Sequence, residues 1–298
     1  MKFILVNLSL QNWLIAIRPK TLSAAIAPVF IGLSYAYHLE IFKPLIGLLT
    51  LLASVLIQIG TNLANDVFDF EKGTDTEERI GPKRVTQGGL LSSKQVKTGM
   101  VYSFFSALLI GCYLAWIGGI PIVIIGTIAI ISGYTYTGGP FPLGYNGLGD
   151  VFVFIFFGVI AVPGTYYLQG GELFDITAIS LGIIMGLLAD CILIVNNIRD
   201  ADNDIKTGKR TLAVLFGKPF SIIQYGLFTS IPFVYPFWIY HHSVPKLALF
   251  IVLFCLPIAI KNIIDVWEKS GSSLNQVLAN TARLQFIYTI LLALGFII

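Results

Sequence analysis

Long apolar runs, separated by shorter polar segments, follow one another from Leu22 to the end of the chain. Each run is close to the ~20 residues that an α-helix needs to cross a bilayer core about 30 Å thick. Nine such runs lie at about residues 22–38, 45–65, 99–117, 121–137, 149–168, 175–197, 219–240, 246–264 and 281–298. They predict an all-α integral membrane protein, a bundle of about nine transmembrane helices forming one domain over residues 1–298.

The composition agrees with this interpretation. Of the 298 residues, 56% are hydrophobic and only 12% are charged, which is more apolar surface than a soluble core could bury. The first run follows Arg18-Pro19-Lys20 and lacks a small-residue cleavage site, so we expect a retained helix and not a signal peptide. The segment from Trp13 to Leu22 predicts a short interfacial helix that is broken at Pro19.

The basic residues are distributed unevenly between the two ends of these runs. When the nine runs are assigned to alternate sides, all of the 19 Lys and Arg residues except Lys43 and Lys246 fall on one side. Basic residues next to membrane spans accumulate on the cytosolic side. We therefore predict a multi-pass protein of the cell (inner) membrane whose N-terminus is cytosolic.

Two of the apolar runs end in polar clusters on this basic side. The second run leads into Gln58, Asn62, Asp66 and Asp69. In a continuing helix, spacings of four, four and three residues place these side chains on one face. The sixth run leads into Asp190, Asn197, Asp200 and Asp204, spaced by seven, three and four residues. Two acidic faces on the same side predict one shared cation site.

Asp190 differs from the other acidic residues because it lies well inside the sixth run. A carboxylate at that depth must face a polar interior, since exposure to lipid costs several kcal/mol. It therefore either takes part in function or makes a structural hydrogen bond to a neighbouring helix.

Basic residues accompany both acidic clusters: Lys83 and Arg84 follow the first, and Lys209 and Arg210 follow the second. A charge run is often only a solvated face. Here, however, hard cations such as Mg²⁺ bind through carboxylates together with substrate phosphates, and the backbone at Gly88–Gly89 is suited to approach a phosphate. The combination predicts a metal-bridged diphosphate site at the membrane face, which suits a substrate with a long lipid tail such as a polyprenyl diphosphate.

Two further segments leave their roles open. The Gly- and Pro-rich loop from Tyr134 to Asp150 holds tyrosines and a carboxylate that either cap helices or line a pocket. Arg18 and Lys20 either anchor the chain at the lipid headgroups or approach an anionic ligand.

Other classes of multi-spanning protein share some of these features. An ion-coupled transporter would explain Asp190 but not the pairing of carboxylates with basic residues on one side. A CDP-alcohol phosphotransferase is also metal-dependent, but its Asp-Gly-x-x-Ala-Arg motif is absent from the chain.

At these residues the sequence resembles the UbiA superfamily of intramembrane prenyltransferases, and most closely the branch that acts on 1,4-dihydroxy-2-naphthoate in menaquinone biosynthesis. The matching blocks, within about residues 13–217, are Arg18-Pro-Lys-Thr-Leu22, Asn65-Asp66-x-x-Asp69-x-x-x-Gly73-x-Asp75, Tyr136-Thr-Gly-Gly-Pro140 and Asn196-Asn-x-Arg-Asp-x-x-x-Asp-x-x-x-Gly-Lys-Arg-Thr-Leu212. Many members carry an acidic residue where this chain has Gly73, and a basic residue where it has Gly138-Gly139. Both departures fit the naphthoate branch.

The resemblance implies a helical bundle around a central cavity, with cytosolic helix-loop caps. It implies that Mg²⁺ and the diphosphate are held by Asp66, Asp69, Asp200 and Asp204. The other site residues that it implies are Asn62, Asn65, Asn197 and Tyr136 in catalysis, and Lys83, Arg84, Arg199, Lys209 and Arg210 in diphosphate binding.

The activity implied by the resemblance is transfer of a polyprenyl group from its diphosphate to 1,4-dihydroxy-2-naphthoate, with loss of carbon dioxide, giving demethylmenaquinol. Homogentisate or 4-hydroxybenzoate as the acceptor stays an alternative. The expected partners are these two substrates and the lipid bilayer, with no nucleic acid and no obligate protein partner.

Overall fold

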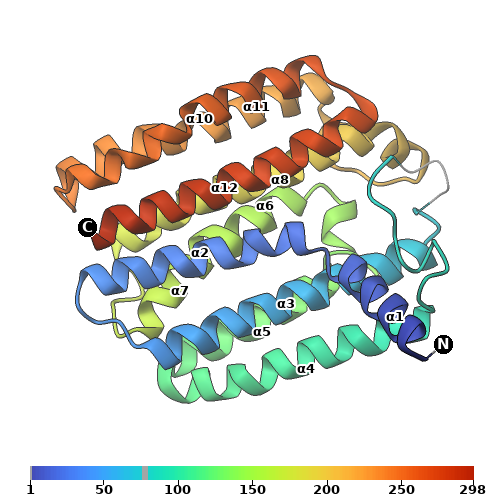
Figure 1. The fold of residues 1–298 in the computed structure, drawn as a ribbon, viewed down its shortest axis with the longest axis horizontal. Coiled ribbons are helices and arrows are strands. Elements are labelled where there is room, and N and C mark those ends of the chain that lie inside the picture. The colour runs from blue at the N-terminus through green and yellow to red at the C-terminus, as the bar shows by residue number, and fades with distance from the viewer. Residues whose placement is uncertain (1, 76–79) are drawn as a thin grey trace.

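The computed structural model describes residues 2–75 and 80–298, with side chains from Leu10 onward within these ranges. The described chain is helical throughout, without a β-strand, and its long helices lie side by side as a bundle (Figure 1). The elements are α1 (Lys2–Ile17), α2 (Pro19–His38), α3 (Pro44–Glu71), α4 (Ser93–Gly118), α5 (Ile120–Thr135), η1 (Leu143–Tyr145), α6 (Gly149–Phe154), the π-helical η2 (Ile155–Ile160), α7 (Ala161–Leu168), α8 (Ile176–Lys206), α9 (Leu212–Leu215), α10 (Lys218–His242), η3 (Leu247–Cys255), α11 (Leu256–Glu268), η4 (Gly271–Ser273) and α12 (Leu274–Ile297).

The predicted all-helical membrane architecture is confirmed, while the count of nine is only approximate. Within the described residues, 7 helices are long and apolar enough to cross a bilayer. An eighth span arises if the bent pair Leu10–Ile17 and Pro19–His38 is taken as one, and the remaining apolar run forms the shorter Ile120–Thr135. Each predicted run therefore lies on a helix, but not every helix has full spanning length.

The predicted break before the first long helix is also confirmed. Arg18 adopts a left-handed backbone conformation with φ 51°, Pro19 begins α2, and the two helices meet at 52°. Proline is well placed at this first helical position, because its missing N–H would have no partner there.

The α8 helix lies at the centre of the bundle. In its most apolar window 78% of the residues are buried inside the protein, compared with 17% in α4. Glycines allow its close contact with η2, since a Cβ on Gly158 would lie only 2.4 Å from the carbonyl oxygen of Gly182. The helix that carries the second acidic cluster is therefore held rigidly on several sides.

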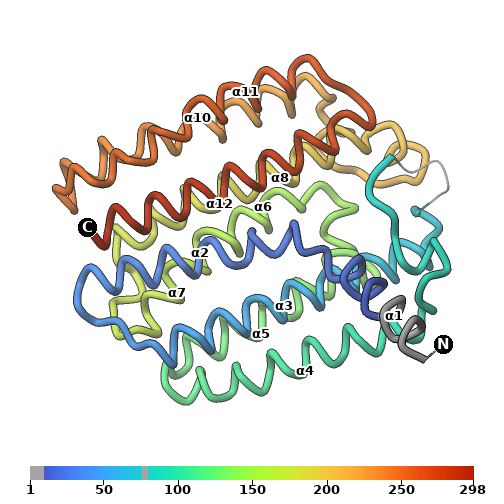
Figure 2. Tube along the Cα trace, in the orientation of Figure 1, coloured from blue at the N-terminus to red at the C-terminus, as the bar shows by residue number. Residues whose placement is uncertain are grey.

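Both acidic clusters lie at the same end of the bundle. The C-terminal ends of α3 and α8 reach the end where the chain from Ile80 to Ser92 crosses, opposite the end that holds the C-terminus (Figure 2). The Asn203 side chain, on α8 next to Asp204, donates a 3.4 Å hydrogen bond to the carbonyl of Thr74, which joins α8 to the segment that follows α3. The predicted common side of the clusters is thus confirmed.

Candidate active site

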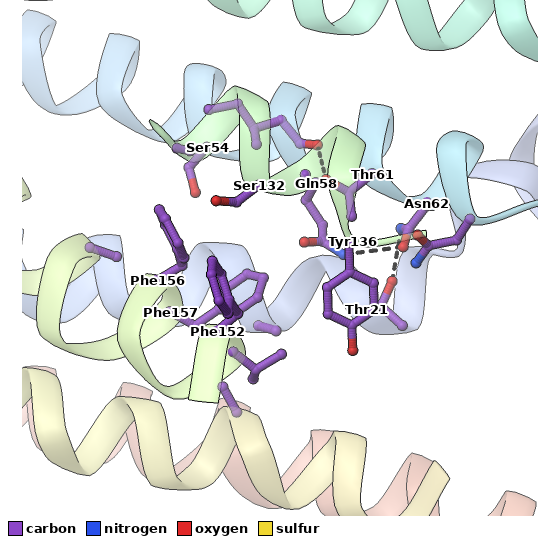
Figure 3. A pocket seen from close by; sticks show the side chains of 18 of the residues that line it. Thr21, Ser54, Gln58, Thr61, Asn62, Ser132, Tyr136, Phe152, Phe156 and Phe157 are labelled. Carbon is purple, nitrogen blue, oxygen red and sulfur yellow. Dashed lines mark hydrogen bonds between the residues drawn. The ribbon is translucent and has the colours of Figure 1, made fainter. Parts of the chain in front are cut away.

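A cavity of about 960 Å³ runs between the helices toward this end of the bundle. Its walls are mainly apolar, and Phe152, Phe156 and Phe157 stand together on one side of it (Figure 3). The polar lining includes Ser54, Gln58, Thr61, Asn62, Ser132 and Tyr136. A cavity with a long apolar body suits a ligand with an extended hydrocarbon chain.

The end of this cavity is charged. Residues from both acidic clusters and from the loops beside them line it: Asn65, Asp69, Lys83, Arg84, Asn196, Asn197, Arg199 and Lys209. A smaller adjoining cavity shares Asp69, Arg84 and Lys209 with the large one and adds Asp200 and Asp204. The structure therefore brings together carboxylates and cations that are more than a hundred residues apart in the chain.

Asp66 lies outside both cavities. Its side chain is buried, and its carboxylate oxygens accept the backbone N–H groups of Thr86 at 2.9 Å and Val85 at 3.2 Å. In this arrangement the carboxylate holds the loop that carries Arg84. Asp66 was expected among the metal ligands, but its geometry here is that of a residue that positions the loop.

Asp69, one helical turn further along α3, faces the charged end of the cavity. Its carboxylate accepts hydrogen bonds from the Arg84 guanidinium at 3.0 Å and from the Tyr145 hydroxyl at 2.7 Å. The Arg84 guanidinium also lies 3.2 Å from the Asp75 carboxylate. Because all three charged groups are buried, the arginine compensates two carboxylates in a region of low dielectric.

Tyr145 was not anticipated as a site residue. The ammonium groups of Lys72 and Lys209 lie 4.7 Å and 4.9 Å from the centre of its ring. Burial, with a contribution from the Asp69 charge, raises the pKa of Tyr145 well above its usual range, so the hydroxyl stays protonated and donates to Asp69. Its position within the tyrosine-rich central loop was the only signal in the sequence.

The asparagines of the first cluster have separate environments. The Asn62 amide donates to the Ile17 carbonyl at 2.8 Å and to the Thr21 hydroxyl at 2.9 Å, and its oxygen accepts from Gln58 at 3.1 Å (Figure 3). Asn62 thus ties the break between α1 and α2 to α3. Asn65 instead faces the cavity, and its oxygen accepts from Thr137 at 2.9 Å.

Arg199 is committed to other protein groups. Its guanidinium makes a bidentate contact to Asp200 at 2.6 Å and 2.7 Å, and it also donates to Asn196 and Asn275. The expected diphosphate ligand is therefore bound to one of the expected metal ligands. Asp204 lies next to this pair in the smaller cavity, and Asn197 is buried at the wall of the larger one.

The basic residues of the two loops are not equivalent. Lys209 lines both cavities and Lys83 lines the larger, whereas Arg210 is exposed and lines neither. The Gly88 and Gly89 amides donate to backbone carbonyls of their own turn, at 3.0 Å and 3.1 Å. These two amides therefore already hold the turn of the loop together in this structure.

The four aspartates do not form a preassembled ion site. Within the described ranges, no group of three or more His, Cys, Asp or Glu side chains is close enough to hold a metal ion. The donor set nevertheless fits a hard divalent cation, because the cavities are lined by the carboxylates Asp69, Asp200 and Asp204 and by Asn65, whose amide oxygen is also a hard ligand. Such a cation, with its bound phosphates, would have to draw these oxygens together.

The sequence left the roles of Asp150 and Asp190 open. Asp150 lies in the first turn of α6, is 5% exposed, lines the larger cavity and accepts a 3.4 Å hydrogen bond from Gln224. Asp190 is 1% exposed on α8, which packs against α6. Its Oδ1 has no hydrogen-bond partner.

Comparison with known proteins shows which family the chain resembles in sequence. Residues 25–292 match the UbiA prenyltransferase family. The chain is 35% identical over 303 residues to the 1,4-dihydroxy-2-naphthoate octaprenyltransferase of Haemophilus influenzae, covering 99% of this chain and 98% of that protein. It is 40% identical over 215 residues to the enzyme of the same name from Escherichia coli, covering 70% of this chain and 69% of that protein.

Solved structures agree with the fold. A UbiA homologue from Aeropyrum pernix K1 superimposes with a TM-score of 0.68 at 15% identity, covering 94% of this chain and 98% of that one. A UbiA homologue from Archaeoglobus fulgidus, bound to GPP and Mg²⁺, superimposes with a TM-score of 0.65 at 13% identity, covering 96% and 100%.

Proposed function

The chain belongs to the UbiA prenyltransferase family, and from this premise we propose that it transfers a polyprenyl group from polyprenyl diphosphate to 1,4-dihydroxy-2-naphthoate, with loss of carbon dioxide. The product is demethylmenaquinol, a precursor of menaquinone. Support for the acceptor comes from the relatives, several of which bear the name of this activity. The observation that carries the proposal is the meeting of two acidic helix ends with buried cations at one end of a long apolar cavity.

The donor fits this cavity in one orientation. Its diphosphate belongs at the charged end, where Lys83 and Lys209 face the cavity, and its polyprenyl tail belongs in the apolar body. Arg84 neutralises Asp69 and Asp75 and so keeps this end from becoming strongly negative before the donor binds. The reverse orientation would bury a highly charged group among phenylalanines, at a large desolvation cost.

We assign Asn65, Asp69, Asp200 and Asp204 as the residues that would hold Mg²⁺ together with the diphosphate. When bound, the cation supplies positive charge that stabilises the departing diphosphate. Asp66 then acts indirectly, by holding the loop that carries Arg84. Asn62 also acts indirectly, through the corner between α1 and α2.

The reaction has two parts, loss of the diphosphate at the charged end of the cavity and attack of the naphthalene ring on the resulting allylic cation. The bond between the allylic carbon and the diphosphate oxygen breaks with the electron pair going to oxygen, and Lys209 stabilises the negative charge. The aromatic ring of Tyr136 lines the cavity beside the charged end and would stabilise the allylic cation. The naphthalene ring attacks through the carbon that bears the carboxylate, and the pair released by loss of carbon dioxide restores aromaticity.

We further propose that one transmembrane prenyltransferase domain spans residues 1–298 of a cell-membrane protein, with the charged end of the cavity facing the cytosol. The basic residues at that end support this orientation. The naphthoate and the polyprenyl donor would then meet at the bilayer surface.

The direct test is mass spectrometry of products formed by the purified protein in detergent or liposomes. The protein is given Mg²⁺, a series of polyprenyl diphosphates, and 1,4-dihydroxy-2-naphthoate, homogentisate or 4-hydroxybenzoate in parallel. We expect a prenylated naphthol that has lost carbon dioxide, and no product when Mg²⁺ is chelated. Efficient prenylation of one of the other acids, with none of the naphthoate, would contradict the proposed acceptor.

A further inference from the structure

Asp150, in the wall of the cavity, and Asp190, on the helix packed against it, have no role in the donor site described above. Asp150 is on α6 and Asp190 on α8, and the two elements pack against each other. A buried carboxylate without a hydrogen-bond partner is costly, so a protein retains one where it has a use or where a ligand completes its hydrogen bonds. The pair therefore marks a polar position in an otherwise apolar wall.

The groups around Asp150 suit a hydroxyl ligand. Gln224 donates to Asp150 through its amide nitrogen, while the Gln224 amide oxygen has no partner. The Tyr136 hydroxyl lies against the start of α6, since a Cβ added to Gly149 would be 2.9 Å from it. Asp150, which lines the cavity, therefore lies close to Tyr136, the ring assigned above to stabilising the allylic cation.

We propose that Asp150 binds a ring hydroxyl of the aromatic acceptor and takes its proton as the new carbon–carbon bond forms. This inference rests on the proposed function, since it assigns the acceptor subsite of that reaction. Asp150 lines the cavity and can reach the acceptor, whereas Asp190 lies on the helix packed against α6, is 1% exposed and does not line the cavity. Asp150 is therefore the base, and Asp190 acts as a positioning residue.

The step balances without an added reagent. The O–H bond of the acceptor breaks, its proton moves to an Asp150 oxygen, and the electron pair left on the hydroxyl oxygen raises the electron density of the ring. The ring then forms the bond to the allylic carbon, and carbon dioxide leaves with the electron pair of its bond returned to the ring. The proton finally returns from Asp150 to the product oxygen.

The test compares wild type with Asp150→Asn on three acceptors: 1,4-dihydroxy-2-naphthoate, 1-hydroxy-2-naphthoate and 4-hydroxy-2-naphthoate. In wild type, an acceptor that lacks the hydroxyl bound by Asp150 should react more slowly than 1,4-dihydroxy-2-naphthoate. This loss of rate should be about ten- to hundredfold larger in wild type than in Asp150→Asn. In the variant the same change of acceptor should have a small effect, because the carboxylate that binds the hydroxyl has already been removed. The ratio of the two losses cancels the intrinsic reactivity of each ring.

Three controls make the outcome decisive. Asp175→Asn removes a carboxylate at the opposite end of α8, where it caps the helix, and should leave all three rates near wild type. Asp190→Asn should keep the hydroxyl discrimination, because an amide resembles a neutral acid in shape and hydrogen bonding. Affinity for a non-reactive donor analogue should be unchanged in Asp150→Asn, which reports an intact fold.

Two results would overturn the inference. If removing either hydroxyl lowers the single-turnover rate by the same factor in wild type and in Asp150→Asn, Asp150 does not contact the acceptor. If Asp150→Asn weakens binding of the donor analogue by as large a factor as it slows single-turnover transfer, the two aspartates have a structural role. If wild type prenylates no naphthoate at all, the proposed function has failed, and the same comparison is made on the phenol that the enzyme does accept.

Discussion

The Asp66 carboxylate accepts a 2.9 Å hydrogen bond from the backbone N–H of Thr86, outside the cavities, while Asp69 on the next turn faces the cavity. Two aspartates of one motif therefore have different expected effects. Asp66→Ala should leave two buried amides without acceptors, at roughly 1–3 kcal/mol each, and loosen the loop around Arg84. Hydrogen exchange should become faster in residues 82–91.

Metal titrations separate these two roles. Asp69→Ala should require much more Mg²⁺ for half-maximal turnover, while its loop keeps slow hydrogen exchange at the Asp66 contacts. Asp66→Ala should reduce turnover at saturating Mg²⁺ with a smaller change in the Mg²⁺ requirement. Equal changes in Mg²⁺ requirement, with unaltered exchange in Asp66→Ala, would show that Asp66 is a direct ligand.

Arg84 is expected to matter for stability as well as for activity. It is 7% exposed and lies within 3.0 Å of Asp69 and 3.2 Å of Asp75. Arg84→Ala removes the buried cation that lies between these two carboxylates, which we expect to destabilise the protein by roughly 3–5 kcal/mol. Thermal unfolding in detergent measures this loss, and Lys97→Ala, whose partner Glu71 is well exposed, serves as the control with a change below about 1 kcal/mol.

Conversely, Asp75→Asn should be tolerated better than Arg84→Ala. It removes one of the two negative charges and leaves Arg84 paired with Asp69. A larger loss of thermal stability in Asp75→Asn than in Arg84→Ala would contradict this account of the network.

The sequence predicted the helices better than their ends. Hydropathy falls where the polar clusters begin, so the second and sixth spans were expected to end near residues 65 and 197. In the structure α3 continues to Glu71 and α8 to Lys206. The prediction that the helix continues beyond the apolar run through the first acidic cluster is therefore confirmed, while hydropathy alone gave helix ends that were too early.

Individual contacts at the site were less accessible to prediction. Spacing placed Asp66 and Asp69 near each other, but only tertiary packing brings Thr86 to one and Tyr145 to the other. The π-helical turn at Ile155–Ile160 likewise has no local signal, because it accompanies the close approach of Gly158 to α8. Contacts between segments distant in the chain have no periodicity that a single sequence reveals.

The two adjacent basic residues of the second loop provide a matched pair of variants. Lys209 lines both cavities, and Arg210 is exposed outside them. Lys209→Ala should weaken binding of a non-reactive donor analogue by about tenfold or more, because it removes a cation from the diphosphate end. Arg210→Ala should bind the analogue almost as wild type does, and equal weakening in the two variants would contradict the assignment.

Tyr136 should behave in the opposite way to Lys209. Its ring lines the cavity beside the charged end, so Tyr136→Ala removes cation stabilisation from the transition state and leaves the phosphate contacts in place. Single-turnover transfer to 1,4-dihydroxy-2-naphthoate should slow much more than donor binding weakens. Tyr136→Phe, which keeps the ring, should retain most of the rate. Equal losses of donor affinity in Tyr136→Ala and Lys209→Ala would remove the separate role of Tyr136.

The membrane orientation can be tested on the same loops. Lys83 and Lys209 line one cavity and must therefore lie on the same face of the membrane, whereas His242 ends α10 at the other end of the bundle (Figure 1). In a variant whose native cysteines are replaced, Lys83→Cys and Lys209→Cys should be labelled by an impermeant maleimide only after the cells are opened. His242→Cys should be labelled in intact cells.

Labelling of Lys83→Cys and Lys209→Cys from opposite faces would refute the shared site, because a membrane would then separate the two basic loops. Labelling of both from outside would keep the shared site and reverse only the orientation, and the polyprenyl donor would then have to be supplied from the outer face.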